Sequence, residues 1–104
     1  MNGEMFQDFF LGFVKIHILY HASKEPIYGA EILEELGRHG YRLSPGTLYP
    51  TLHRLEREGY LAVEKKVVAG KVRKYYTATE QGLAVLGESK KKIAELVDEV
   101  LLDR

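Results

Sequence analysis

The stretch that decides the fold runs from residue 44 to residue 76 and reads SPGTLYPTLHRLEREGYLAVEKKVVAGKVRKYY. Ser44 belongs to the residue types that cap helix N-termini, and Pro45 suits the first helical position. Gly59 is suited to end that helix, because glycine readily adopts the left-handed conformation found after a last turn. The first half of the stretch therefore predicts a capped helix.

The second half predicts a hairpin. Residues 61–68 and 72–77 are rich in β-branched and aromatic types, and the turn is expected over Ala69-Gly70-Lys71. Five basic residues and one acidic residue lie between Glu64 and Tyr76, although the net charge of the whole chain is zero. A helix followed by a locally basic hairpin is typical of a winged helix-turn-helix, in which helix and wing both meet DNA.

The predicted helix has two distinct faces. Leu48, Leu52 and Leu55 recur at spacings of four and three, which places them on one buried face. At 100° per residue the opposite face carries Gly46, Thr47, Pro50, His53, Arg54 and Arg57. Pro50 lies early enough that its missing N–H costs little.

That opposite face suits a major groove. Glycine lets the backbone approach phosphate, helix N-terminal N–H groups bind phosphate, and arginine commonly pairs with guanine. Taken singly, each of these residues is more often a solvated surface residue than a DNA contact. Together with the basic hairpin, they indicate a DNA-binding surface. The predicted DNA-binding residues are Tyr28, Ser44, Gly46, Thr47, Tyr49, Pro50, Thr51, His53, Arg54, Lys71, Arg73 and Lys74.

Three further helices are expected, over residues 5–22, 28–39 and 80–103. The first is apolar on nearly every side, so one face is expected to pack on the domain and the other on a second chain. A central core helix in a monomer is the weaker alternative. In the last helix Leu86, Ile93 and Val100 recur every seven residues. The predicted dimer-interface residues are Phe6, Phe10, Phe13, Leu86, Ile93, Val97, Val100 and Leu101.

The expected fold class is therefore α+β, mainly α: a winged helix-turn-helix domain over residues 1–79, including the N-terminal helix, and a dimerisation helix over residues 80–104. The chain has 104 residues, 45% of them hydrophobic, and no cysteine, which excludes disulfides and cysteine-ligated zinc. Its longest apolar run, Phe9 to Val14, is too short to span a bilayer. These features favour a cytoplasmic protein.

His17 and His21 lie four apart in a predicted helix, a spacing that can chelate a metal. No third histidine lies near them in sequence. A half-buried interface role is therefore favoured, and no metal or other cofactor is expected. No catalytic triad, phosphate-binding glycine loop or acid–base carboxylate pair is recognisable, so an enzyme is not expected.

Three segments resemble the PadR family of bacterial transcriptional regulators: IYGAEILEEL (residues 27–36), LSPGTLYPTLHRLEREGYL (43–61) and KVRKYYTATEQG (71–82). The resemblance covers about residues 18–82, and the single long C-terminal helix is similar to that of the short subfamily. It implies a homodimer built on the first and last helices. It also implies operator binding, usually repression, and an inducer that is a phenolic acid or a hydrophobic drug.

Two departures limit what the resemblance implies. The hairpin tip reads VAGKVRK, where family members often have glycines and arginines, so wing contacts are expected to differ in detail. The chain has no tryptophan, which some short members use to stack flat drugs. The candidates for binding an aromatic effector are instead Phe6, Phe9, Phe10 and Phe13. The alternative is that these rings fill a solid dimer core.

Two classes of function are therefore weighed. The leading hypothesis is a homodimeric repressor that binds a pseudo-palindromic operator on double-stranded DNA and is released by a small aromatic or hydrophobic effector. The alternative is a winged-helix module that binds other proteins and never touches DNA. The concentrated basic hairpin favours the first hypothesis.

Overall fold

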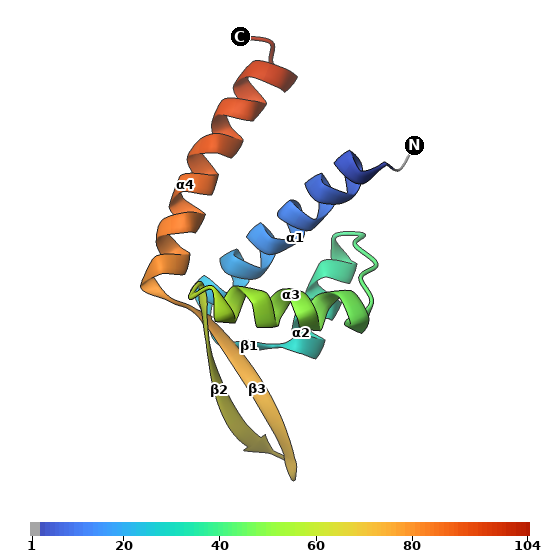
Figure 1. Ribbon diagram of the computed structural model, residues 1–104, viewed down its shortest axis with the longest axis vertical. Helices are drawn as coiled ribbons and strands as arrows, with labels where there is room; N and C mark the ends of the chain where they lie inside the picture. The colour runs from blue at the N-terminus through green and yellow to red at the C-terminus, as the bar shows by residue number, and fades with distance from the viewer. Residues whose placement is uncertain (1–2) are drawn as a thin grey trace.

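The computed structural model describes residues 3–104, which form a helical body with a small sheet (Figure 1). In chain order the elements are α1 (Glu4–Lys24), β1 (Ile27–Tyr28), α2 (Gly29–Arg38), α3 (Pro45–Arg57), β2 (Leu61–Val68), β3 (Lys71–Ala78), α4 (Glu80–Leu96) and a π-helical turn (Val97–Leu101).

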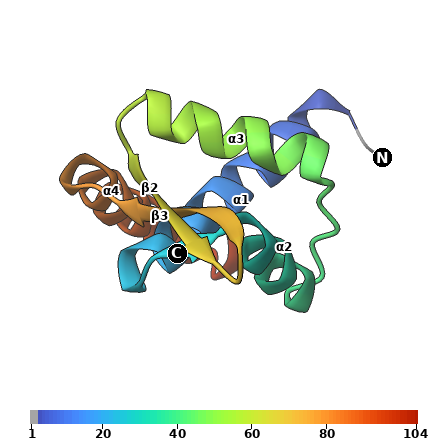
Figure 2. The same cartoon turned by 90° about the horizontal axis from the view of Figure 1, so that it is seen from below.

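The molecule is elongated, with principal extents of 53 × 32 × 23 Å. The β2–β3 hairpin projects from one end, whereas α4 and the N-terminal half of α1 project from the other (Figure 1). Seen from the hairpin tip, α3 crosses on one side of the hairpin and α2 lies beside it (Figure 2). The two ends are therefore free to meet different partners.

The core lies where α1 meets α2, α3 and the base of the sheet. The predicted leucine stripe of α3 is confirmed, because Leu48, Leu52 and Leu55 are all buried. From α1 only the second half contributes buried residues, starting at Val14. Tyr76 of β3 is among the largest fully buried side chains. This core fixes α3 and the base of the hairpin relative to one another.

The sheet has three strands in the order β1-β3-β2, all antiparallel. The sequence predicted only the two strands of the hairpin, and it wrongly placed Tyr28 inside the second helix. Glu25, which precedes Pro26, is extended, as residues before proline usually are. The chain then pairs Ile27 with Tyr76 and Tyr28 with Tyr75 before α2 begins at Gly29.

The predicted start and end of the third helix are confirmed. The Thr47 backbone N–H donates to Ser44 Oγ at 3.2 Å, and Pro45 occupies the first helical position. Gly59 follows the helix with φ of 90°, and Gly40 follows α2 with φ of 85°. Both glycines adopt the left-handed conformation that ends a helix.

The hairpin turn is tighter than expected. Val68 pairs with Lys71, so the turn contains only Ala69 and Gly70, and Lys71 is already in β3. Both turn residues have positive φ, 53° and 77° respectively. A two-residue turn with positive φ at both positions matches the right-handed twist of the strands, which is why it prevails over a three-residue loop.

The last helix begins as predicted but ends earlier as an α-helix. The Gly82 N–H donates to the Thr79 hydroxyl at 3.0 Å, which caps α4. The α-helix continues to Leu96 and passes into the π-helical turn, instead of running unbroken to Asp103. The first helix is longer than predicted and reaches Lys24.

The start of α4 lies unusually close to the loop after α3. A methyl group added at Gly82 would overlap the carbonyl oxygen of Tyr60 and come within 3.4 Å of Leu19. The same carbonyl accepts the Thr79 N–H at 3.1 Å, and the Thr79 hydroxyl donates to the Gly59 carbonyl at 2.6 Å. Only glycine fits at position 82 without moving these groups.

We therefore expect Gly82→Ala to destabilise the fold by about 3 kcal/mol, because the backbone atoms that it meets cannot rotate away. Gly87 of the same helix is the matched control, since a methyl group there would meet no atom within 4 Å. Gly87→Ala should stabilise the fold by about 0.5–1 kcal/mol through helix propensity. Urea unfolding of both variants measures the difference, and equal effects would contradict the close approach.

Candidate nucleic-acid interface

A groove of about 450 Å³ separates α3 from the hairpin. Its floor is formed by the start of α2, its sides by α3 and β3, and both predicted groups of DNA-binding residues reach it. The residues around it are Tyr28, Gly29, Ala30, Tyr49, His53, Val72, Arg73, Lys74 and Tyr76. The fold thus brings His53 of the helix and Arg73 and Lys74 of the hairpin to one surface.

The outer face of α3 is open to solvent. Gly46, Pro50, His53 and Arg54 are exposed. Thr47 and Thr51 are partly buried, and the Thr51 hydroxyl donates to the Thr47 carbonyl at 2.8 Å. The exposed set agrees with the face predicted from helical periodicity and leaves one imidazole and one guanidinium group free to meet a ligand.

The hairpin concentrates positive charge in cross-strand pairs. Lys65 lies directly opposite Lys74, and Lys66 lies directly opposite Arg73. Like charges at directly opposed positions destabilise a sheet. Within residues 3–104 the only recorded ion pair of these four cations is a contact of 3.8 Å from Lys66 to Glu64, and both side chains are exposed. These four cations therefore form a largely exposed and uncompensated basic surface on the hairpin.

Aromatic rings hold part of this charge in place. The Arg73 guanidinium lies 4.4 Å from the ring centroid of Tyr28, and the Lys66 ammonium lies 5.1 Å from that of Tyr75. The two tyrosine rings meet edge to face at 5.4 Å. Cation–π contacts of this kind are worth about 0.5–1 kcal/mol at exposed sites. They orient Arg73 beside the groove.

Tyr49 and Gly29 form a close contact at the groove. A methyl group at Gly29 would lie 2.6 Å from the Tyr49 hydroxyl oxygen, so only glycine lets this ring lie against the start of α2. Tyr49 is nevertheless exposed. Its ring therefore packs against the start of α2 while part of its surface remains accessible to a ligand.

Tyr76 lies at the inner wall of the groove. Burial raises the pKa of its hydroxyl above the ordinary value, and the nearby charge of Glu56 raises it further. The hydroxyl therefore stays protonated at neutral pH. It can donate a hydrogen bond but adds no negative charge beside the basic groups.

The predicted interface and effector residues lie at the opposite end of the molecule. Phe6, Phe9 and Phe13 form a partly exposed row on α1, with ring centroids 6.5 and 5.6 Å apart. Phe10 instead packs on Tyr41 at 5.5 Å. On α4, Leu86 is buried within the chain and Ile93 is exposed, and in the π-helical turn Val97, Val100 and Leu101 are exposed. Leu86 thus contributes mainly to the core of its own chain.

A second groove, of about 480 Å³, lies between α1 and α4. It is mostly apolar, and its walls are not the phenylalanine rings that the sequence suggested. The sequence contained the apolar residues but not the crossing of the two helices that brings them together. They are Ile16, Ala84, Val85, Ile93 and Leu96.

Residues 18–88 match the model of the family described as "Transcriptional regulator PadR-like family". The chain is 53% identical over 88 residues to the transcriptional regulator Rv3488 of Mycobacterium tuberculosis, covering 85% of this chain and 82% of that protein.

Solved structures of PadR-like regulators have a similar fold. A PadR-like transcription factor from Bacteroides fragilis superposes with a TM-score of 0.84 at 30% identity, covering 98% of this chain and 100% of that one. A PadR family transcriptional regulator from Eggerthella lenta gives a TM-score of 0.77 at 38% identity, covering 92% and 81%.

Proposed function

This chain belongs to the PadR-like family of transcriptional regulators, and we propose that it is a homodimeric repressor that binds a pseudo-palindromic operator. Residues 1–79 would contact DNA, and residues 80–104 would hold the dimer together. The protein is a regulator and not an enzyme. No helix among residues 3–104 is long and apolar enough to cross a membrane. We place its action in the cytoplasm, where the operator lies.

The observation that carries the DNA-binding proposal is the pairing of like charges in the hairpin beside the exposed face of α3. Cations that are directly opposed in a sheet repel one another, and phosphate relieves that repulsion. His53 and Arg54 are exposed on the adjacent helix at positions suited to base edges or phosphates. The hairpin would therefore supply affinity and the helix sequence preference.

The dimer proposal rests on exposed apolar side chains at the other end. Phe9 is 58% exposed, Val100 65% and Leu101 74%. Apolar surface gathered on two adjacent helices is costly in water and marks an interaction site. A second copy is the partner that the family resemblance implies. The α3 helices of the two copies would then lie about one DNA turn, ~34 Å, apart.

The effector proposal rests on the groove between α1 and α4. Its surface is mostly apolar, with Gln81, Glu88, Ser89 and Lys92 at its walls, and its volume suits a small aromatic or hydrophobic compound. Because the groove lies beside the exposed faces of both helices, a bound compound would favour one dimer geometry over another. Its effect on DNA binding is limited by its difference in affinity for the two geometries.

We expect Arg73→Ala/Lys74→Ala to weaken binding to all duplexes alike. For each phosphate contact that is lost, the slope of log affinity against log salt concentration should become less steep by about 0.9. The matched control, Lys91→Ala/Lys92→Ala, removes the same charge from α4 at the far end. Fluorescence anisotropy on operator and random duplex measures both. Equal salt slopes for the two double variants would favour the protein-binding alternative.

We expect a homodimer at micromolar concentration that buries more than ~1,000 Å² in total. Val97→Asp/Leu101→Asp should dissociate it, because carboxylates would have to be buried in an apolar interface. Lys91→Asp, at an exposed charged position of α4, should leave it intact. Sedimentation velocity distinguishes the species. A wild-type chain that sediments as a monomer would rule out the dimer.

We expect some compounds in a panel of aromatic acids and hydrophobic drugs to raise the melting temperature of the wild-type protein. Val85→Trp should abolish that rise by filling the groove, whereas Leu83→Trp, on an exposed part of α4 outside the groove, should preserve it. Differential scanning fluorimetry provides the measurement. A panel that shifts neither the wild type nor the control would indicate that the apolar surfaces serve only the dimer.

A further inference from the structure

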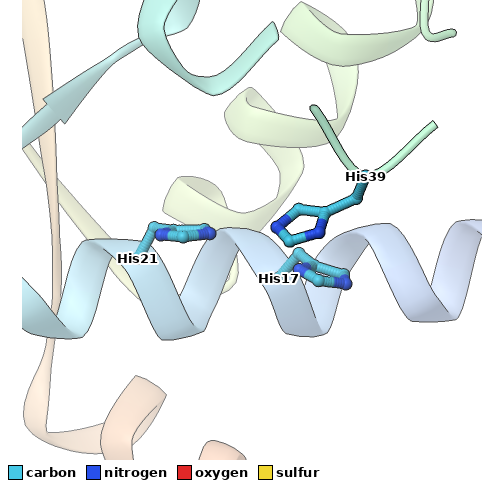
Figure 3. Close-up of side chains that lie close together, drawn as sticks. All are labelled: His17, His21 and His39. Carbon is cyan, nitrogen blue, oxygen red and sulfur yellow. The ribbon is translucent and has the colours of Figure 1, made fainter. Parts of the chain in front are cut away.

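Three of the four histidines of the chain meet at one place, although the sequence separates them (Figure 3). His17 and His21 lie four residues apart on α1, and His39 directly follows α2. One imidazole nitrogen from each can be chosen so that all three lie within 4.8 Å of one another. The ring of His17 lies 5.1 Å from that of His39 and 6.3 Å from that of His21.

The spacing of the three imidazole nitrogens is close to that of the ligand atoms in a metal site. Tetrahedral zinc with Zn–N bonds of about 2.0–2.1 Å requires ligand nitrogens about 3.3 Å apart. The rings must therefore approach by up to about 1.5 Å. His39 is exposed and lies outside the helix, so its side chain can move without disturbing packed residues. The pair on α1 has the spacing of helical chelating histidines.

Carboxylates line a pocket on one side of the cluster. The pocket, of about 210 Å³, lies beside His17 and His21 and is also lined by Glu25, Glu31, Glu34, Glu35 and Arg38. Arg38 already pairs with Glu35 at 2.9 Å and with Glu34 at 3.6 Å. The side chains of this pocket thus carry a net negative charge, which favours a dication nearby, and water would supply a fourth ligand.

Packing alone accounts for only part of the cluster. The His17 ring meets Phe13 and Tyr41 edge to face, both at 5.4 Å, as a core aromatic ring would. His39 packs less closely, at 6.4 Å from Tyr41, and it is exposed. His21 meets Tyr20 edge to face at 5.1 Å. Packing therefore explains His17 and part of the position of His21, but it gives no reason for the exposed His39 to lie beside them.

We propose that His17, His21 and His39 form a binding site for a divalent transition-metal ion of the Zn²⁺ type. The ion would connect α1 to the end of α2. Because these helices come from separate segments of the chain, the bound ion would stabilise the folded state relative to the unfolded one.

The test is a Co²⁺ titration of the full chain, followed by visible absorption and then by Zn²⁺ competition. Wild-type protein should bind one Co²⁺ per chain with the visible bands of a tetrahedral ion, and Zn²⁺ should displace it. His39→Gln should weaken binding at least ten-fold while leaving the far-UV circular dichroism unchanged, because His39 is exposed and outside the helices. His21→Gln should weaken it similarly.

His53→Gln is the matched control, because it removes the one remaining histidine, which lies on α3 away from the cluster. It should bind Co²⁺ like the wild type. Zn²⁺ should also raise the melting temperature of the wild type and of His53→Gln, and EDTA should reverse the rise. Unchanged Co²⁺ affinity in His39→Gln, loss of affinity in His53→Gln, or no binding by the wild type would each overturn the proposal.

Discussion

The structure depends on one backbone contact, between the loop after α3 and the start of α4. The Gly59 and Tyr60 carbonyls accept hydrogen bonds from Thr79, and Gly82 brings α4 against the same loop. The hairpin leaves the body at this loop and returns to it just before Thr79, so the contact closes the base of the hairpin. It also joins the end of α3 directly to the helix with exposed apolar residues. In a dimer, a change in how α4 pairs would therefore move α3.

Each end of the molecule carries a feature that costs free energy in a single chain in water, and the two costs differ in kind. The hairpin end carries like charges that face one another across two strands, and the helical end carries exposed phenylalanine, valine and leucine side chains. The first cost is electrostatic and is relieved by a polyanion, whereas the second is hydrophobic and is relieved by another apolar surface. Since the ends point in opposite directions, one chain would have room for the proposed DNA and the proposed second copy at once (Figure 1).

The features that the sequence predicted are those set by local chemistry. Ser44 and Gly59 are residues that commonly begin and end helices, and the α3 leucine stripe follows from helical periodicity. The features that it missed depend on tertiary contacts. β1 has two residues and exists because Tyr28 pairs with Tyr75. The opposition of Lys65 to Lys74 follows only once the turn is known to contain two residues. His39 reaches His17 because α2 folds back on α1, which no local spacing indicates.

In the proposed dimer, two α3 helices face successive turns on one side of the DNA duplex. Pulsed electron paramagnetic resonance can measure their separation, because a chain without cysteine takes a single spin label at Glu58→Cys. This position is exposed, directly follows α3 and lies outside the predicted DNA-binding residues. The distance between the two labels of the dimer should be near ~34 Å, and its distribution should narrow when operator DNA is added. A sample with no dipolar coupling, or a distance that DNA leaves far from one helical turn, would contradict this arrangement.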